Sequence, residues 1–76
     1  HSNATAYPGE TAAQRAERQA AEAYYCKRAT EILSSYEGAP QLYRTNDAGE
    51  RQDLSDAEMA ATIADARAKT SELCAQ

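Results

Sequence analysis

Two cysteines have the clearest chemical potential in this chain. Cys26 and Cys74 bracket most of the sequence that could fold, and between them lie a helix end, a turn and a new helix start. A bond between the two sulfurs would therefore close a helical hairpin. The cysteines do not form a C-x-x-C pair, and no activating motif adjoins either of them, so a structural role is favoured over a catalytic one.

A disulfide is preferred to two free thiols because the chain is short. At 76 residues it buries only about 60% of the surface of its unfolded form. Its larger apolar side chains are five Tyr, four Leu, two Ile and one Met, with no Val, Phe or Trp. Closing a loop of about 50 residues removes about 4 kcal/mol of denatured-state entropy, comparable to what such a core supplies. A disulfide persists in oxidising compartments, so a periplasmic or secreted location is predicted.

Other candidate chemistry is sparse. The one histidine, His1, belongs to a terminal segment, His1 to Ala4, that resembles a vector remnant beside a purification tag. An oxygen-rich cluster surrounds Gly49, but Arg44 stands where a calcium-binding loop needs its first acidic ligand, so a plain turn is favoured. The cluster comprises Asn46, Asp47, Glu50 and Asp53. No catalytic residue, cofactor or metal site is predicted, and an enzyme is not expected.

Charge and hydropathy narrow the classes of partner. The chain has eight basic and twelve acidic residues, and its isoelectric point is near 4.8. This acidic balance argues against a nucleic-acid partner. No apolar run approaches the ~20 residues that span a bilayer, so no membrane span is expected in this chain, although a lipid anchor on a removed N-terminus is compatible with it. For the tyrosines, packing between elements is favoured over an aromatic binding surface, with Tyr7 and Tyr24 the most exposed. The tyrosines weighed for packing are Tyr24, Tyr25, Tyr36 and Tyr43.

The element signals predict a mainly α fold: a two-helix antiparallel hairpin with a short irregular β-ribbon or loop between the helices, closed by one disulfide. Residues 1–10 are assigned to the vector remnant and a flexible lead, and residues 11–76 to a single domain. Within that domain the first helix covers 11–37, the ribbon 42–54 and the second helix 56–75.

Local motifs mark these boundaries. Thr11 opens a capping box that ends at Gln14, and Ser55 opens a second one, Ser55 to Glu58. Gly38 followed by Pro40 supplies a helix stop. The remaining markers are Leu54 and Met59, at the positions of a hydrophobic staple, and Gly49, which can take a positive φ in a bulged hairpin.

Three- and four-residue steps predict which helix faces point inward. On the second helix these are Met59, Ile63, Ala66, Thr70 and Leu73. On the first helix they are Ala16, Ala20, Ala23, Cys26, Ala29, Leu33 and Tyr36, with Tyr25 and Ile32 widening the face toward its C-terminal end.

The lengths of the two predicted helices indicate that the first one extends past the end of the second. If Cys74 pairs with Cys26, the first helix continues from Thr11 to Tyr25 for about 15 residues, or roughly 22 Å, with no intrachain partner. Its small side chains permit close approach of a second helix, so a homodimer, a partner helix or a missing upstream domain could cover it. The possible interface comprises Ala13, Ala16, Ala20, Ala23 and Tyr24. The alternative is a solvated, alanine-rich helix held by its own propensity.

The spacing also resembles a known family. Its marks are Cys26-Lys27-Arg28-Ala29, Leu42-Tyr43-Arg44, Asp47-Ala48-Gly49-Glu50-Arg51, Leu54-Ser55-Asp56-Ala57-Glu58 and Leu73-Cys74. Together they resemble the C-terminal segment of small Gram-negative envelope proteins that carry the domain of unknown function four-one-two-four. The resemblance covers about two thirds of the chain. It implies export and a Cys26 to Cys74 bridge, and it assigns no activity.

Two functions are compatible with this sequence. The preferred one is an exported, non-enzymatic interaction or scaffold module of the cell envelope that presents its first helix to a second copy or a protein partner. The alternative is a small secreted inhibitor or immunity-type protein that binds an enzyme through its acidic 46–56 ribbon.

Overall fold

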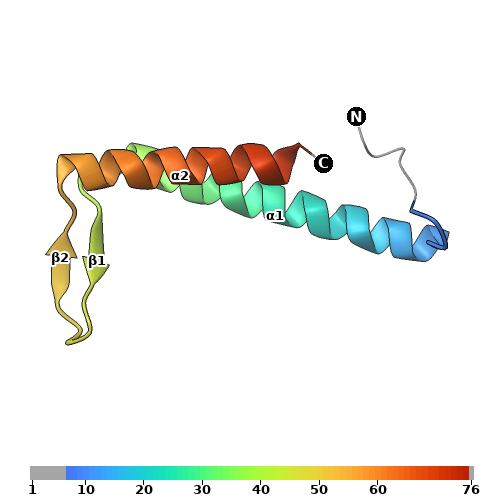
Figure 1. The fold of residues 1–76 in the computed structure, drawn as a ribbon, viewed down its shortest axis with the longest axis horizontal. Coiled ribbons are helices and arrows are strands. Elements are labelled where there is room, and N and C mark those ends of the chain that lie inside the picture. Colours follow the sequence, from blue (N-terminus) through green and yellow to red (C-terminus); the bar gives the residue numbers. More distant parts are fainter. Residues whose placement is uncertain (1–6, 76) are drawn as a thin grey trace.

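Two antiparallel helices and a ribbon between them make up the fold (Figure 1). The computed structural model describes residues 7–75. Helix α1 spans Ala12–Gly38, strands β1 and β2 span Tyr43–Thr45 and Arg51–Asp53, and helix α2 spans Asp56–Cys74. This confirms the predicted hairpin, with helix ends within one residue of those expected. The vector remnant predicted for His1 to Ala4 lies outside the described residues.

The ends of α1 follow from local chemistry. The Gln14 amide donates to Thr11 Oγ1 (3.1 Å), and the Thr11 amide donates to Gln14 Oε1 (2.9 Å), so the predicted capping box is present. Gly38 is the last helical residue and has no positive φ, unlike Gly9 and Gly49. The stop therefore comes from the extended Ala39, whose backbone is held out of the helical region by the proline that follows it.

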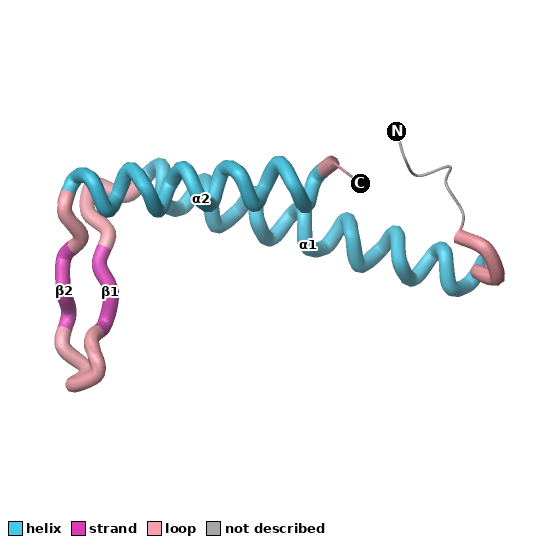
Figure 2. Tube along the Cα trace, in the orientation of Figure 1, coloured by secondary structure: helices cyan, strands magenta, loops and turns pink. Residues whose placement is uncertain are grey.

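The ribbon is a two-stranded antiparallel hairpin that projects from the end of the helix pair (Figure 2). Tyr43 pairs with Asp53, and Thr45 pairs with Arg51. Asn46 shapes the turn, because its Oδ1 accepts from the amides of Ala48 and Glu50, each at 2.9 Å. Gly49 has φ +81°, as the predicted bulged hairpin requires.

Gln41, for which the sequence predicts no role, connects the two ends of the ribbon. Gln41 Nε2 donates to the carbonyls of Leu42 (2.8 Å) and Leu54 (2.9 Å). The Leu54 amide donates to the Leu42 carbonyl at 2.9 Å. Met59 Sδ accepts from the Leu42 amide at 3.4 Å. These bonds fix the base of the ribbon against the first turn of α2.

The second capping box starts α2 and links it to the ribbon. The Glu58 amide donates to Ser55 Oγ (3.1 Å), and the Ser55 amide donates to Glu58 Oε1 (2.8 Å). Arg44 Nη2, on β1, donates to the other carboxylate oxygen of Glu58 at 2.8 Å. The bonds from Ser55 and Arg44 lower the pKa of Glu58 from 4.5 to about 2.

This lowered pKa gives the fold an acid dependence. Because the folded state holds Glu58 ionised below its ordinary range, the stabilisation is complete above about pH 4.5 and is lost as the pH falls toward 2. Glu58→Gln keeps an acceptor at the capping position but cannot titrate. We expect its free energy of unfolding, measured by urea titration, to change less between pH 5 and about pH 2 than that of the parent chain. Equal acid slopes in the two proteins would contradict this assignment.

The seam between the helices is shallow. Among residues 7–75 no side chain is fully buried. The predicted inward face of α2 is confirmed as part-buried along its whole length, at Met59, Ile63, Ala66, Thr70 and Leu73. Thr70 Oγ1 donates to the Ala29 carbonyl at 3.2 Å, which joins the two helices by a side chain to backbone bond.

On α1 the predicted inward face is correct only from Cys26 onward. Cys26, Ala29, Leu33 and Tyr36 are part-buried, whereas the three alanines placed with them, Ala16, Ala20 and Ala23, are exposed. The steps from Ala20 to Ala29 are three residues each, and at about 100° per residue they add up to half a turn around the helix. Ala20 and Ala29 therefore lie on opposite sides. Before the bridge, the seam side instead carries the part-buried residues Arg15, Arg18 and Glu22.

Candidate interaction site

A disulfide joins the end of α2 to the interior of α1. Cys26 and Cys74 are bonded with their Cα atoms 4.8 Å apart, which confirms the predicted staple. Both cysteines of the chain are used in it. Because Cys26 stands near the middle of α1, the bridge leaves the N-terminal half of that helix beyond the reach of α2.

The overhang of α1, residues 12–25, extends past the end of α2 for about 14 residues, or ~21 Å (Figure 1). The possible interface residues predicted from the sequence, Ala13, Ala16, Ala20, Ala23 and Tyr24, are all exposed along it. They lie on a side of α1 turned away from the seam. Their role as an interface stays a prediction.

The seam side of the overhang is covered by the residues before the helix. Arg18 Nε and Nη2 donate to the two carboxylate oxygens of Glu10, at 2.8 and 3.1 Å, and the Arg18 guanidinium lies 4.3 Å from the centre of the Tyr7 ring. The Glu10 amide donates to the Tyr7 carbonyl across a turn in which Gly9 has φ +78°. Residues 7–10, part of the lead predicted for 1–10, therefore form a turn that contacts α1.

The bond from Arg18 also lowers the pKa of Glu10 below its ordinary value. The contact pairs a carboxylate with a guanidinium through two parallel hydrogen bonds, a geometry that favours Arg over Lys. Sequence reasoning could have found this pair only by placing Glu10 in a turn that reverses the chain toward the helix. The signal for that reversal was the Tyr7-Pro8-Gly9-Glu10 turn itself.

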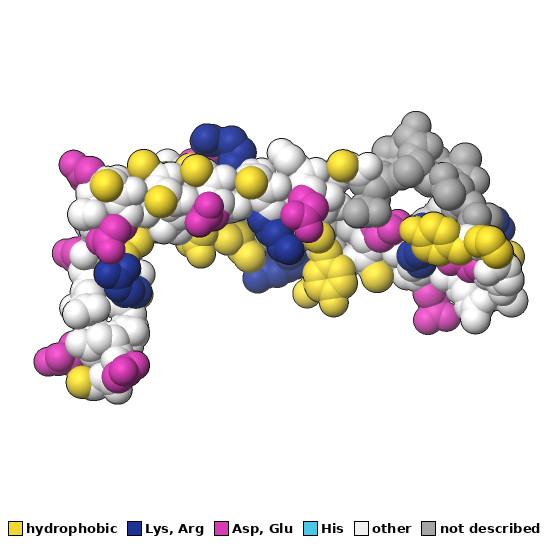
Figure 3. Space-filling model, in the orientation of Figure 1, with side chains coloured by type: hydrophobic (Ala, Val, Ile, Leu, Met, Phe, Trp, Pro, Cys, Tyr) yellow, Lys and Arg dark blue, Asp and Glu magenta, His cyan; other side chains and the backbone are white. Residues whose placement is uncertain are grey.

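A shallow groove of about 240 Å³ runs between α1 and α2, beside the bridge. Tyr25, Ala29 and Ile32 from α1 and Ala66 and Leu73 from α2 give it an apolar lining. Arg28 and Lys69 also line it. In the space-filling view, hydrophobic and basic side chains adjoin below the middle of the helix pair (Figure 3).

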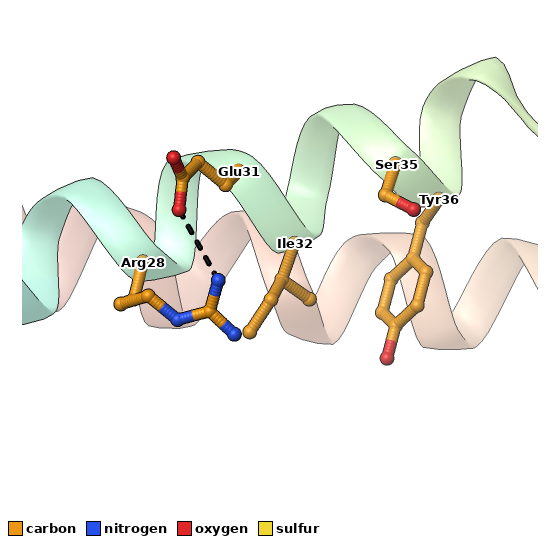
Figure 4. A pocket seen from close by; sticks show the side chains of 5 residues that line it. All are labelled: Arg28, Glu31, Ile32, Ser35 and Tyr36. Atoms are coloured by element: carbon orange, nitrogen blue, oxygen red, sulfur yellow. Dashed lines mark hydrogen bonds and ion pairs between the residues drawn. The ribbon is translucent and has the colours of Figure 1, made fainter.

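A second hollow, of about 300 Å³, continues along α1 and shares Arg28 and Ile32 with the groove. Figure 4 shows Ile32 and Tyr36 hanging from α1 on the same side, next to Arg28, which bonds to Glu31 at 3.2 Å. Ile32 and Tyr36 thus extend the exposed apolar surface along α1, among the polar side chains of Arg28, Glu31 and Ser35.

The tyrosines are more exposed than predicted. Tyr25 and Tyr43, expected to pack between elements, have 57% of their surface exposed, nearly the same as Tyr24 at 58%. Only Tyr36 is part-buried. Tyr24 and Tyr25 contact each other edge to face, with ring centres 5.2 Å apart.

The ribbon presents mixed charge. All six strand residues are exposed. Asp53 pairs with Arg51 at 2.9 Å, and the Arg51 guanidinium lies 4.4 Å from the centre of the Tyr43 ring. Glu50 accepts from Asn46 Nδ2 at 3.1 Å, so this side chain takes part in forming the turn. Asp47 projects at the tip of the ribbon, among exposed residues.

Within residues 7–75 no group of three or more histidine, cysteine or acidic side chains is arranged to hold a metal ion. In the same part of the chain neither helix combines the length and the apolar character needed to cross a bilayer. Comparison of the chain with protein-family models, with curated proteins and with solved structures finds no match.

Proposed function

We propose that this chain is an exported, non-enzymatic interaction or scaffold module of the cell envelope that presents the overhang of α1 to another helix. One observation carries the proposal: about half of α1 lies beyond the bridge, where α2 cannot cover it. The disulfide is compatible with an oxidising compartment, which supports the export part of the proposal.

The energetics of short helices support a covered overhang. A helical segment of about 14 residues is marginal in water even when it is rich in alanine, because most helical stability in proteins comes from tertiary packing. The Glu10 and Arg18 contact covers the seam side only. The alanine side and the Tyr24–Tyr25 pair remain open to a partner.

The shape of the molecule points the same way. The radius of gyration is 17.1 Å, whereas a compact chain of this length has about 11 Å. The molecule is therefore elongated, as expected when one helix extends well past the other.

Amide hydrogen exchange along the overhang tests the proposal. We expect exchange of residues 12–25 in the purified chain to slow as its concentration rises, while exchange of α2 is unchanged. The α2 amides are the internal control because the bridge and the seam protect them at every concentration. A strict monomer whose 12–25 amides exchange as fast as those of an unstructured peptide would overturn the proposal.

A second candidate is favoured by the ribbon. It projects from the helix pair with both strands exposed, as a segment that enters a cleft would (Figure 1). In this alternative the chain is a small secreted inhibitor or immunity-type protein, and the acidic 46–56 ribbon blocks the basic cleft of an enzyme.

Charge reversal tests this alternative. Replacing Asp47, Glu50 and Asp53 by lysine should abolish inhibition across a panel of cationic hydrolases while the helical circular dichroism stays unchanged. The exposed Asp65→Lys change, on α2, is the matched control and should leave inhibition intact. Equal inhibition by the triple variant and the control, or no inhibition by the parent chain, would exclude the ribbon as the inhibitory segment.

A further inference from the structure

We propose that strand β2 pairs along its outer edge with β2 of a second copy, antiparallel, so that the two ribbons join into one sheet. The two-fold axis of this dimer passes through the sheet at Gln52. The inference goes beyond the proposed function, because it assigns a partner to the ribbon and leaves the overhang of α1 free. Both copies use the same edge, so the contact closes at two chains.

The backbone of the ribbon shows which groups of β2 are already bonded to β1. The Asn46 amide donates to the Glu50 carbonyl, and the Leu54 amide donates to the Leu42 carbonyl, each at 2.9 Å. Residue pairs in an antiparallel ladder alternate between those that exchange hydrogen bonds and those that do not. Gln52, midway between these two bonded pairs, therefore also turns its amide and carbonyl toward β1.

The two residues that flank Gln52 face the other way. By the same alternation, the amides and carbonyls of Arg51 and Asp53 point away from β1, along the outer edge of β2. In Figure 1 the ribbon projects from the helix pair, and this edge lies on its side away from the overhang. All three residues of β2 are exposed. An open edge of this kind is a template for a further strand.

Charge selects one register for a second copy of β2. Backbone bonding requires outward residues to oppose outward residues, so the pairing can centre on Arg51, Gln52 or Asp53. Centring on Arg51 or on Asp53 places like charges directly opposite each other, which destabilises a sheet. Centring on Gln52 places Arg51 of each copy opposite Asp53 of the other. The segment Arg51-Gln52-Asp53 is therefore complementary to itself when it runs antiparallel.

This register adds to the contacts of the single chain without breaking them. Arg51 pairs with Asp53 of its own strand at 2.9 Å, and their side chains are 61% and 58% exposed. Alternate residues of a strand share one face, so both pairs of the dimer lie on the same face with their charges alternating. Each Arg51 then lies between two carboxylates. Its guanidinium keeps its place 4.4 Å from the centre of the Tyr43 ring.

The outer edge of β1 is less suited to a second copy. The segment Tyr43-Arg44-Thr45 carries one charge, so antiparallel pairing about its centre places Arg44 directly opposite Arg44. Arg44 also bonds to Glu58 at the start of α2, at 2.8 Å. The comparison of the two edges therefore favours β2.

The contact is small, and its place in the fold leaves the overhangs accessible. Strands of three residues bury little area, so we expect a weak dimer in fast exchange. The ribbon and the overhang lie at opposite ends of the molecule (Figure 1). A dimer joined at β2 therefore carries one overhang on each side, and each remains free to contact another helix.

Amide exchange within β2 tests the inference on the parent chain. Nuclear magnetic resonance of the full chain across a concentration series measures exchange with water residue by residue. We expect the Arg51 and Asp53 amides to exchange more slowly as the concentration rises. The Gln52 amide, already bonded to β1, is the internal control and should keep its rate.

Charge variants test the register. Arg51→Glu alone and Asp53→Arg alone should each weaken self-association about tenfold in sedimentation equilibrium, since each change alters both cross-strand pairs at once. An equimolar mixture of the two variants should associate within about twofold of the parent, because each supplies the charges that the other lacks. The matched controls, Lys27→Glu and Asp65→Arg, make the same charge changes at exposed positions of α1 and α2 and should leave the dissociation constant unchanged.

The outcomes separate this inference from the proposed function. A chain whose Arg51 and Asp53 amides exchange freely at every concentration overturns the inference, and protection of residues 12–25 in that chain would leave the proposed function standing. Self-association that neither single variant weakens, or that the mixture does not restore, also overturns the inference. Protection confined to β2 would support the inference and count against the proposed function. The amide measurement uses the parent chain alone, so it decides the inference even if a variant fails to fold.

Discussion

Replacing both cysteines, Cys26→Ala together with Cys74→Ala, is expected to unfold the helix pair at room temperature. The bridge closes a loop with a sequence separation of 48 residues, so its loss returns about 4 kcal/mol of entropy to the unfolded chain. Among the described residues no side chain is fully buried, and a core of this kind supplies no more than about 3–5 kcal/mol. The two amounts are similar, so the bridge decides whether the hairpin folds.

Thermal unfolding followed by circular dichroism measures this effect. We expect the melting temperature to fall by about 20 °C or more, since each 1 kcal/mol shifts it by about 4–8 °C in a chain of this size. Measurements at low protein concentration keep self-association from adding stability. Reductant should have the same effect on the parent chain and none on the double variant. An unchanged melting temperature after verified reduction would show that the seam holds the helices without the bridge.

The elements themselves could be predicted because their boundaries are set locally. Thr11 and Ser55 cap the helices through bonds to residues three positions ahead, and the structure shows both boxes. Gly49 adopts the positive φ expected of it. The bridge could be predicted because only two cysteines are present, and a chain with so few large apolar residues requires a covalent staple.

The inward side of α1 could not be predicted as reliably, because alanine is compatible with either environment. Two series have the three- and four-residue spacing of a helix face. One is Ala16, Ala20 and Ala23, and the other is Arg15, Arg18 and Glu22. Only the second series continues into Cys26 and Leu33 with the average step of about 3.6 residues of an α-helix, and only that side is covered in the structure. Because the second series is polar, the periodicity of apolar residues does not reveal it.

The groove and the lead turn depend on contacts between distant residues. Leu73 and Tyr25 meet because each precedes a bonded cysteine, and Glu10 meets Arg18 because a glycine turn reverses the chain. Once the bridge is assigned, the first contact follows from it. The second required the turn from Tyr7 to Glu10 to be placed against the helix, and no local signal in the sequence does that.

Leu33 and Ile32 offer a direct test of which side of α1 holds the monomer together. Leu33→Ala is expected to lower the free energy of unfolding by about 2 kcal/mol, the lower end of the range for leucine, because Leu33 lies in the part-buried seam. Ile32→Ala, at the adjacent and more exposed position, should lower it by less, about 1 kcal/mol.

Urea unfolding at low concentration measures both values for the monomer. If Ile32→Ala destabilised the monomer as much as Leu33→Ala, the seam would include both side chains. The seam that holds the monomer together would then extend into the groove beside the bridge.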